Sequence, residues 1–388
     1  MEVILMEVIK TLPAIFEEFS EQRRNSFLHA YETKQKNIPF VGTFCTYTPT
    51  EVIMASGAIP VGLCSFSDET IAEAEQDLPR NLCPLIKSSY GFAKTQKCPF
   101  FYFSDLIIGE TTCDGKKKMY EMLGKIKDTY IMELPNRQSP MGRKLWREEI
   151  VALKEKLEEK FGVTITEEKL REQVKLSNQN RLALRHFYEL MKLDPPPMAG
   201  ADLYSVLYGS SFKFERKKAI DEVNALTERI QKEYDEGNRP IPKRPRILVT
   251  GCPIGGNAMK VVKSIEANGG NVVCFENCGG AKSVDELVDE NAEDIYQAIA
   301  DRYLNIGCSC MTPNENRLKL MGRLLEEDKI DAVVEVILQA CHTYNVEAYQ
   351  IKQFVTSKGL PYMCVETDYS SSDVGQLNTR CAAFIEML

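Results

Sequence analysis

The 388-residue sequence predicts an α/β fold with two Rossmann-like domains, each built on a parallel sheet, plus a helical N-terminal segment and a helical insertion. Three observations support this prediction. Short apolar runs alternate with amphipathic stretches, which is the pattern of parallel strands joined by right-handed crossover helices. This pattern occurs twice along the chain. A highly charged stretch, with apolar residues at helical spacing, separates the two copies.

The chain divides into four parts on these grounds. We expect a helical segment over residues 1–37, a first α/β domain over 38–141, a helical insertion or linker over 142–240 and a second α/β domain over 245–388. The insertion is rich in Glu, Lys and Arg, and the run Pro195-Pro196-Pro197 interrupts it. Residues 238–245 contain three prolines and are typical of an extended linker.

The first domain is predicted to contain four strands, at residues 38–44, 58–63, 100–108 and 130–134. A helix should follow the first strand, because Thr48 is a good N-cap, Pro49 suits the first helical position and Glu51 completes a capping box. A polar helix start or loop is expected at 68–77. Further helices are predicted at 85–93 and from residue 116 onward.

The insertion and the second domain follow the same logic. Three helices are predicted in the insertion, at 145–160, 167–193 and 214–236. The second domain should have strands at 246–250, 271–276, 332–338 and 361–366. Its helices are predicted at 257–268, 283–303, 314–327, 349–358 and 376–388.

Composition narrows the class of protein. The formal net charge of −8 argues against nucleic-acid binding, which needs a basic surface. There is no apolar run of about 18 residues or more, so we expect no membrane span. The N-terminus lacks the order of charged, apolar and small residues found in a signal peptide. We therefore expect a cytoplasmic protein.

The distribution of the 13 cysteines is the most informative feature. Five lie between Cys45 and Cys113, eight lie between Cys252 and Cys381, and none lies between these two groups. In open α/β sheets, ligands bind outside the carboxyl ends of the strands. The cysteines expected at strand ends are Cys45, Cys64, Cys113, Cys252, Cys278 and Cys341, while Cys83, Cys308 and Cys310 are expected in loops or helix starts.

No compact metal motif is present, because the chain has no Cys-x2-Cys pair and no ferredoxin-type run of cysteines. Cysteines from several loops can nevertheless converge around an iron–sulfur cluster. The alternative is that they pack as small apolar side chains. From spacing alone this alternative stays open for all of them, and we favour it for Cys274, Cys364 and Cys381, which lie inside predicted strands or a terminal helix.

Several of these motifs resemble the 2-hydroxyacyl-CoA dehydratase family. The stretches at 44–51, 83–91 and 112–117 are similar to its first domain. The stretches at 331–341, 359–368 and 375–386 are similar to its second domain. Within this family the chain looks closest to the double-cubane cluster proteins, which are ATP-dependent reductases. The resemblance covers residues 35–140 and 245–388.

The resemblance implies a cofactor and its ligands. In the family, three cysteines of the first domain carry a 4Fe-4S cluster, and by match these are Cys45, Cys83 and Cys113. Double-cubane proteins hold two sulfide-bridged 4Fe-4S units on six cysteines. The second set would be Cys308, Cys310 and Cys341, although Cys274 or Cys278 could replace one of the first two.

The resemblance also implies a function. Our first hypothesis is a homodimeric, ATP-coupled iron–sulfur oxidoreductase that reduces small molecules, with electrons from an ATP-hydrolysing iron–sulfur activator protein. The alternative is a 2-hydroxyacyl-CoA dehydratase component, a lyase that uses a single 4Fe-4S cluster and ketyl-radical chemistry. A third hypothesis is a non-catalytic accessory protein. Tyr47 and Ser309 lie beside ligand candidates, but the sequence assigns no proton donor or other catalytic residue.

Overall fold

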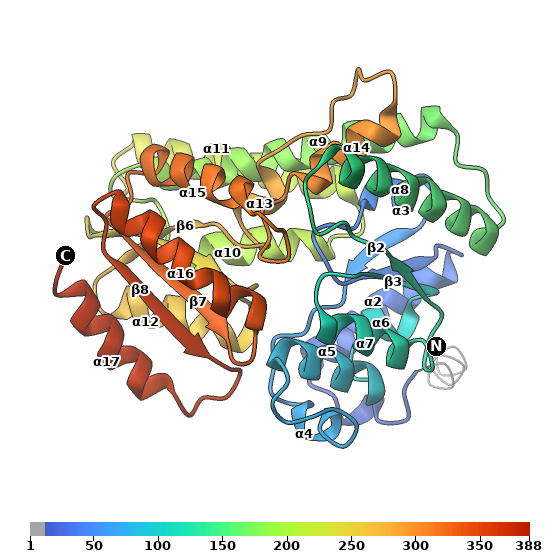
Figure 1. The fold of residues 1–388 in the computed structure, drawn as a ribbon, viewed down its shortest axis with the longest axis horizontal. Helices are drawn as coiled ribbons and strands as arrows, with labels where there is room; N and C mark the ends of the chain where they lie inside the picture. Colours follow the sequence, from blue (N-terminus) through green and yellow to red (C-terminus); the bar gives the residue numbers. More distant parts are fainter. Residues whose placement is uncertain (1–11) are drawn as a thin grey trace.

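The computed structural model describes residues 12–388 and contains two four-stranded parallel sheets in two lobes (Figure 1). The first sheet has the order β2-β1-β3-β4 and the second has the order β6-β5-β7-β8. The two sheets therefore share one topology, in which the chain begins at an inner strand and adds strands on both sides. This confirms the predicted fold class.

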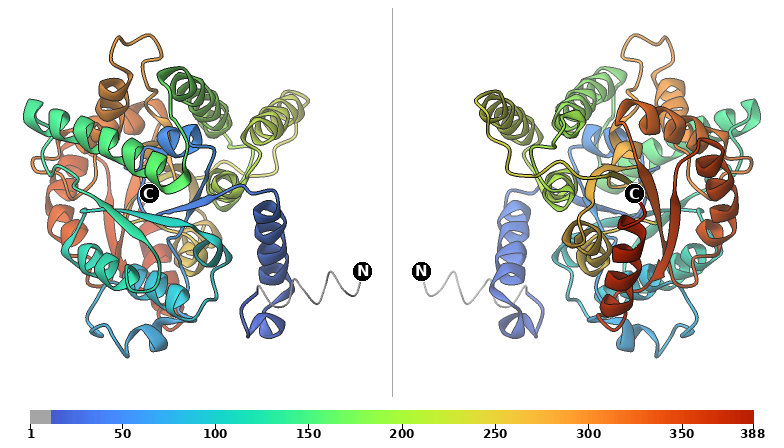
Figure 2. Two further views of the ribbon diagram at one scale, coloured as in Figure 1. Left: turned by 90° about the vertical axis from the view of Figure 1, so that its right-hand side faces the viewer. Right: turned by 90° about the vertical axis from the view of Figure 1, so that its left-hand side faces the viewer.

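The strands of the first sheet are β1 (Phe40–Thr43), β2 (Ile59–Gly62), β3 (Leu106–Glu110) and β4 (Thr129–Met132). The helices of this lobe are α2 (Glu21–Gln35), α3 (Thr50–Ala55), α4 (Ile71–Ala74), α5 (Pro84–Lys94), α6 (Pro99–Phe103) and α7 (Asp114–Leu123). Figure 2 shows that α2 stands at one side of the lobe. It packs on α6 through the buried side chain of Phe27, which contacts the rings of Tyr102 and Phe103.

The strands of the second sheet are β5 (Arg246–Gly251), β6 (Asn271–Phe275), β7 (Ala332–Leu338) and β8 (Tyr362–Thr367). The helices of this lobe are α12 (Lys260–Ala267), α13 (Ala281–Val284), α15 (Glu315–Glu327), α16 (His342–Ser357) and α17 (Val374–Ile385). Helix α14 (Ile295–Leu304) belongs to this half of the sequence but packs on α8 (Figure 1). All seven residues of the inner strand β7 are buried, as a parallel strand covered on both faces requires.

Three predicted elements differ from the structure, one of them because the helix predicted at 349–358 begins earlier, as α16. The predicted strand at 100–108 begins instead with the short helix α6, and only β3 is extended. Pro99 at the first helical position and the Cys98 sulfur, which accepts from the N–H of Phe101, start this helix. The predicted helix at 283–303 is broken into α13 and α14, because Asp294 caps a new helix by accepting from the N–H groups of Tyr296 and Gln297.

The insertion contains four helices among the described residues: α8 (Pro140–Phe161), α9 (Glu167–Glu189), α10 (Gly200–Gly209) and α11 (Arg216–Asp235). The sequence did not predict α10, whose residues are mostly apolar. Helix α9 contacts both lobes. Its Arg181 donates to Glu51 on α3, at 2.5 Å, while the amide of Asn178 donates to the carbonyl of Val288, at 2.8 Å. The bounds of the four predicted parts stay predictions.

The alternation of side chains along the first sheet divides the apolar interior into two cores. Phe40 and Ile107 face a core that is shared with the second lobe. Val41 and Leu106 face a second core, which includes the fully buried Trp146 of α8. One face of the sheet therefore contributes to the core that continues into the second lobe, and the other face shares a core with α8 and α14. Among residues 12–388, no helix combines the length and apolar character needed to cross a membrane.

Candidate functional site

The carboxyl edges of the two sheets face each other. Because every strand pairing is parallel, all strands of a sheet end at the same edge. Residues just beyond these edges bond across the gap: the hydroxyl of Tyr47 donates to the carbonyl of Ile306 at 2.7 Å, and the N–H of Asn257 donates to the carbonyl of Phe66 at 2.9 Å. The cysteines that follow the strands are thus carried toward a common space.

Four of these cysteines form a first sulfur group, made of Cys83, Cys113, Cys252 and Cys341. The thiols of Cys83 and Cys252 both interact electrostatically with the sulfur of Cys341. These two interactions lower the pKa of Cys341, although burial opposes the shift. Burial raises the pKa of Cys113, and the nearby charge of Cys341 raises it further. The group combines cysteines from both lobes.

Three members of this group are N-cap residues. Cys83 precedes α5, Cys113 precedes α7 and Cys341 precedes α16. Backbone N–H groups of the first helical turn face each sulfur and favour its charged form. At Cys83 the interaction with Cys341, and at Cys113 burial, outweighs this effect, so the pKa of these two thiols is raised overall. Free N–H groups and the helix dipole favour a thiolate at this position. The local fold therefore prepares these sulfurs to carry negative charge.

A second sulfur group consists of Cys45, Cys278, Cys308 and Cys310. The thiol of Cys310 hydrogen-bonds to Cys308 and is the main reason that the pKa of Cys308 is lowered. Burial raises the pKa of Cys45, and the charges of Cys278 and Cys308 raise it as well. Tyr47 is fully buried, and burial raises its pKa with contributions from all four sulfurs of this group.

The six cysteines that the resemblance implies as ligands all belong to these two groups, but they are not divided by domain. The first sulfur group contains Cys83 and Cys113 with Cys341, and the second contains Cys45 with Cys308 and Cys310. Of the two alternatives to Cys308 and Cys310, Cys278 lies in the second group. Cys274 lies inside β6, where the hydroxyl of Tyr188 donates to its sulfur at 3.0 Å. The ligand assignment itself stays a prediction.

The other cysteines have structural surroundings. Cys381 is fully buried on α17, and Cys364 lies within β8. Cys98 caps α6, and Cys64 contacts the carbonyl of Phe44 at 3.0 Å. The position of Cys274 and Cys381 inside regular elements was the signal that separated them from the strand-end cysteines.

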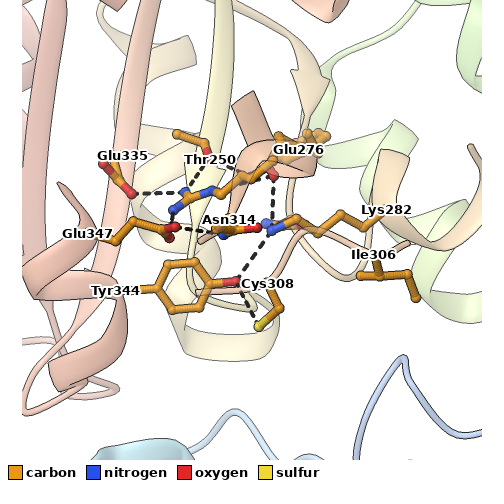
Figure 3. A network of polar contacts seen from close by, with 12 residues as sticks. Thr250, Glu276, Lys282, Ile306, Cys308, Asn314, Glu335, Tyr344 and Glu347 are labelled. Carbon is orange, nitrogen blue, oxygen red and sulfur yellow. Dashed lines mark hydrogen bonds and ion pairs between the residues drawn. The ribbon is translucent and has the colours of Figure 1, made fainter. Parts of the chain in front are cut away.

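A buried network of charged side chains lies next to Cys308 of the second sulfur group (Figure 3). Arg317 is fully buried and donates to Glu335 at 2.9 Å, to Thr250 at 2.9 Å and to Glu347. Its Nε lies 3.5 Å from Glu276. One cation is therefore shared by three carboxylates, which come from β7, α16 and the loop after β6. Sequence reasoning missed this network because each member is an ordinary surface residue type.

The network reaches a cysteine through Tyr344. Lys282, also fully buried, forms an ion pair with Glu276 at 2.9 Å and donates to the hydroxyl of Tyr344 at 3.4 Å. That hydroxyl lies 3.8 Å from the sulfur of Cys308, and Figure 3 shows Tyr344 linked to both Lys282 and Cys308. Burial disfavours the charge on Lys282, but the Glu276 carboxylate outweighs it and raises its pKa. The positive charge of Lys282 therefore lies near Cys308, with the side chain of Tyr344 in contact with both.

Glu110 is a second residue that the sequence did not single out. It ends β3, is fully buried, and its Oε2 has no hydrogen-bond partner within the described chain. Burial raises its pKa to about 7. Thr48 bonds to its other oxygen and, at 3.0 Å, to the carbonyl of Cys45. Thr48 is therefore not the N-cap of α3 as predicted; Pro49 holds that position.

A cavity of about 320 Å³ lies beside the second sulfur group. Cys45, Cys64 and Cys278 line it together with the hydroxyl-bearing Thr48. Four cationic side chains also line it: Lys116, Arg181, Arg216 and Arg302. Lys116 donates to the carbonyl of Phe44 at 3.1 Å. The cavity offers a small molecule a place next to sulfur.

The donor chemistry suits an iron–sulfur cluster better than a single metal ion. Over residues 12–388, no three His, Cys, Asp or Glu side chains converge as the ligands of one ion would. A cluster distributes its ligands over several iron atoms, so its thiolates need not meet at one point, and its protein ligands are mainly cysteines. The two sulfur groups, which consist of thiols only, fit such a cluster.

Comparison with known proteins gives a consistent result. Residues 45–388 match the family described as 2-hydroxyglutaryl-CoA dehydratase, D-component. The chain is 55% identical to the putative dehydratase subunit YjiM of Escherichia coli (strain K12) over 99% of this chain and 100% of that protein. It is 23% identical to the (R)-phenyllactyl-CoA dehydratase beta subunit of Clostridium sporogenes, over 93% of this chain and 94% of the relative.

A more distant relative is named as part of a reductase. It is one of the subunits of the benzoyl-CoA reductase of Thauera aromatica, and it is 20% identical over 88% of this chain and 89% of the relative. The family match covers the second sheet, the whole insertion and every strand of the first sheet except β1, and the identities extend over nearly the full length. The chain therefore belongs to the 2-hydroxyglutaryl-CoA dehydratase D-component family.

Proposed function

We propose that this chain is an iron–sulfur subunit of a 2-hydroxyacyl-CoA dehydratase, a lyase that removes water from its substrate by radical chemistry. The observation that carries the proposal is the convergence of thiols from both sheets at the facing carboxyl edges. The names of the relatives support dehydration more strongly than the reduction of small molecules that we expected first.

The chain's own residues divide the work in this proposal. The two sulfur groups would hold the cluster, which when bound supplies single electrons at low potential. The helix N-termini at Cys83, Cys113 and Cys341 stabilise the thiolates. The cavity binds the reacting part of the substrate beside Cys45 and Cys278. Glu110, linked to the cavity wall through Thr48, holds a proton near neutral pH.

A second candidate is an ATP-coupled reductase with a double-cubane cluster. What favours it is that two sulfur groups, each with cysteines from both lobes, lie at the edges of the sheets. Both candidates include an ATP-hydrolysing iron–sulfur activator as the electron donor. The reductase candidate adds a homodimer and a small-molecule substrate. The cytoplasmic location stays a prediction in either case.

Anaerobic purification with counts of iron and sulfide per chain tests both candidates. About four iron atoms per chain, with dehydration of a 2-hydroxyacyl-CoA when activator and a second dehydratase component are added, supports the dehydratase. About eight iron atoms per chain, without dehydration, supports the double-cubane reductase. Colourless protein without iron contradicts both and leaves a non-catalytic α/β protein.

A further inference from the structure

The three arginines that line the cavity are not equally neutralised. They come from different elements: Arg181 from α9, Arg216 from the start of α11 and Arg302 from α14. The carboxylate nearest to them is Glu51, which is fully buried on α3. Glu51 accepts from Arg181 at 2.5 Å and from the hydroxyl of Tyr303 at 2.8 Å, so both of its oxygens are engaged.

Arg302 has only neutral acceptors. The side chain is 4% exposed, and it donates to the carbonyls of Glu286 and Ser283 at 3.1 and 2.6 Å. Within residues 12–388 it forms no ion pair. Burial lowers its pKa to about 10, and the charge of Arg181 lowers it further. Carbonyl groups satisfy its N–H donors in part but do not cancel its charge.

Arg216 is held even less firmly. Its one hydrogen bond, among the described residues, goes to the carbonyl of Ser210 at a long 3.5 Å. Burial lowers its pKa, and the attraction of Glu51 is opposed by the repulsion of Arg181. The guanidinium of Arg216 therefore has free donors at the wall of the cavity.

Three guanidinium groups thus surround a single buried carboxylate. Arg302 is buried, where a charge without a partner is costly, and Arg216 is partly exposed at the cavity wall, so the excess of positive charge favours an anion. The planar fork of a guanidinium matches the two oxygens of a carboxylate or phosphate. Ser177 and Asn180 also line the cavity and supply neutral polar contacts.

We propose that Arg216 and Arg302 form an oxyanion-binding site in this cavity, which holds a charged end of the substrate while the reacting end lies beside Cys45 and Cys278. The site deepens the proposed function and rests on it for the identity of the reacting end. A cavity of about 320 Å³ is at the small end of the range for ligand sites, so it can hold an acyl group but not a whole coenzyme. The oxyanion is either a free carboxylate of the acyl group or a phosphate.

Calorimetric titration of the anaerobically purified protein tests this site. The probes are glutarate, inorganic phosphate and the neutral glutaramide. Arg216→Gln is the test variant, because Arg216 has no ion pair to lose within residues 12–388. Arg229→Gln, on the exposed face of the same helix, is the matched control. We expect glutarate to bind, and Arg216→Gln to weaken binding about tenfold or more while Arg229→Gln leaves it unchanged.

The outcomes separate the two sources of the oxyanion. Binding of phosphate in place of glutarate, with the same loss in Arg216→Gln, supports the site and assigns it to a phosphate. Equal binding of glutaramide and glutarate, or equal binding in Arg216→Gln and the unsubstituted protein, overturns the proposal. Iron is counted on the same samples. Iron without anion binding refutes this site alone, whereas anion binding without iron refutes the iron–sulfur function alone.

Discussion

The sulfur of Cys83, at the start of α5, interacts electrostatically with the sulfur of Cys341, at the start of α16. The two residues belong to different lobes, and both head helices whose N–H groups face the sulfur. A purely structural explanation requires only that both thiols be buried. Their position at two helix N-termini, where a thiolate is stabilised, is one basis of the cluster proposed above.

Replacing either of these cysteines should therefore reduce iron binding. We expect Cys83→Ala and Cys341→Ala to lose a large part of the iron of anaerobically purified protein, because each removes a ligand that no neighbouring oxygen replaces. Iron and sulfide analysis with visible absorption measures the loss. Cys381→Ala, in the core of α17, is the control and should keep its iron. Unchanged iron in both test variants would contradict the site.

Arg317 should be essential for the stability of the second lobe. In Arg317→Met, three buried carboxylates lose their shared cation, and breaking a buried ion pair typically costs about 3–5 kcal/mol. Urea unfolding measures this change in the free energy of unfolding. The matched control is Arg323→Met, because Arg323 is 42% exposed and its ion pairs should contribute about 1 kcal/mol or less. Equal losses in the two variants would show that the buried network is not stabilising.

Glu110 should make stability depend on pH. Its pKa is raised by burial from 4.5 to about 7, so folding favours the neutral carboxyl. The resulting contribution is fully present below about pH 4.5 and is lost as the pH rises through 7, by a total on the order of 3 kcal/mol. Glu110→Gln removes this titration. We expect the variant to gain stability relative to the unsubstituted protein between about pH 5 and pH 8, in urea unfolding at each pH.

Gly251 should tolerate no side chain. It joins β5 to Cys252 with φ of +105°, and a Cβ there would overlap the carbonyl oxygen of Val336. Gly57 has φ of +84° but nothing within 4 Å of the added atom. Gly57→Ala should thus cost about 1 kcal/mol from backbone conformation alone. Gly251→Ala should lower the free energy of unfolding by at least about 2 kcal/mol more than Gly57→Ala does. Urea unfolding measures both losses. Similar losses in the two variants would mean that the end of β5 can move to accommodate the added methyl group.

Much of the fold was predictable because local patterns determine it. The predicted strand at 332–338 coincides with β7. Its residues are apolar and mostly β-branched, interrupted only by Glu335, and such a run strongly favours a buried strand. The errors fall where local signals compete. Phe100 to Phe103 have strand-forming side chains, but Pro99 and Cys98 begin a helix there. Helix α10 escaped prediction because it is too apolar to show an amphipathic period.

The cysteines of the candidate site were predictable as strand-end residues, but their grouping was not. Which sulfur meets which depends on how the two lobes are placed against each other, and long-range packing with the insertion decides that. Arg317 and Glu110 could not be identified for the same reason. Nothing in the sequence around them distinguishes a buried ion from a surface one.

Helix α9 has a mechanical consequence. Arg181 anchors it to α3 of the first lobe, and Asn178 and Arg185 anchor it to the chain on either side of residue 286 in the second lobe. A hinge motion that separates the lobes would have to break the buried ion pair between Arg181 and Glu51. We expect a docked electron donor to shift side chains and loops at the rim and to leave the separation of the two sheets fixed. The helix thus acts as a spacer that sets the width of the chamber in which the sulfurs meet.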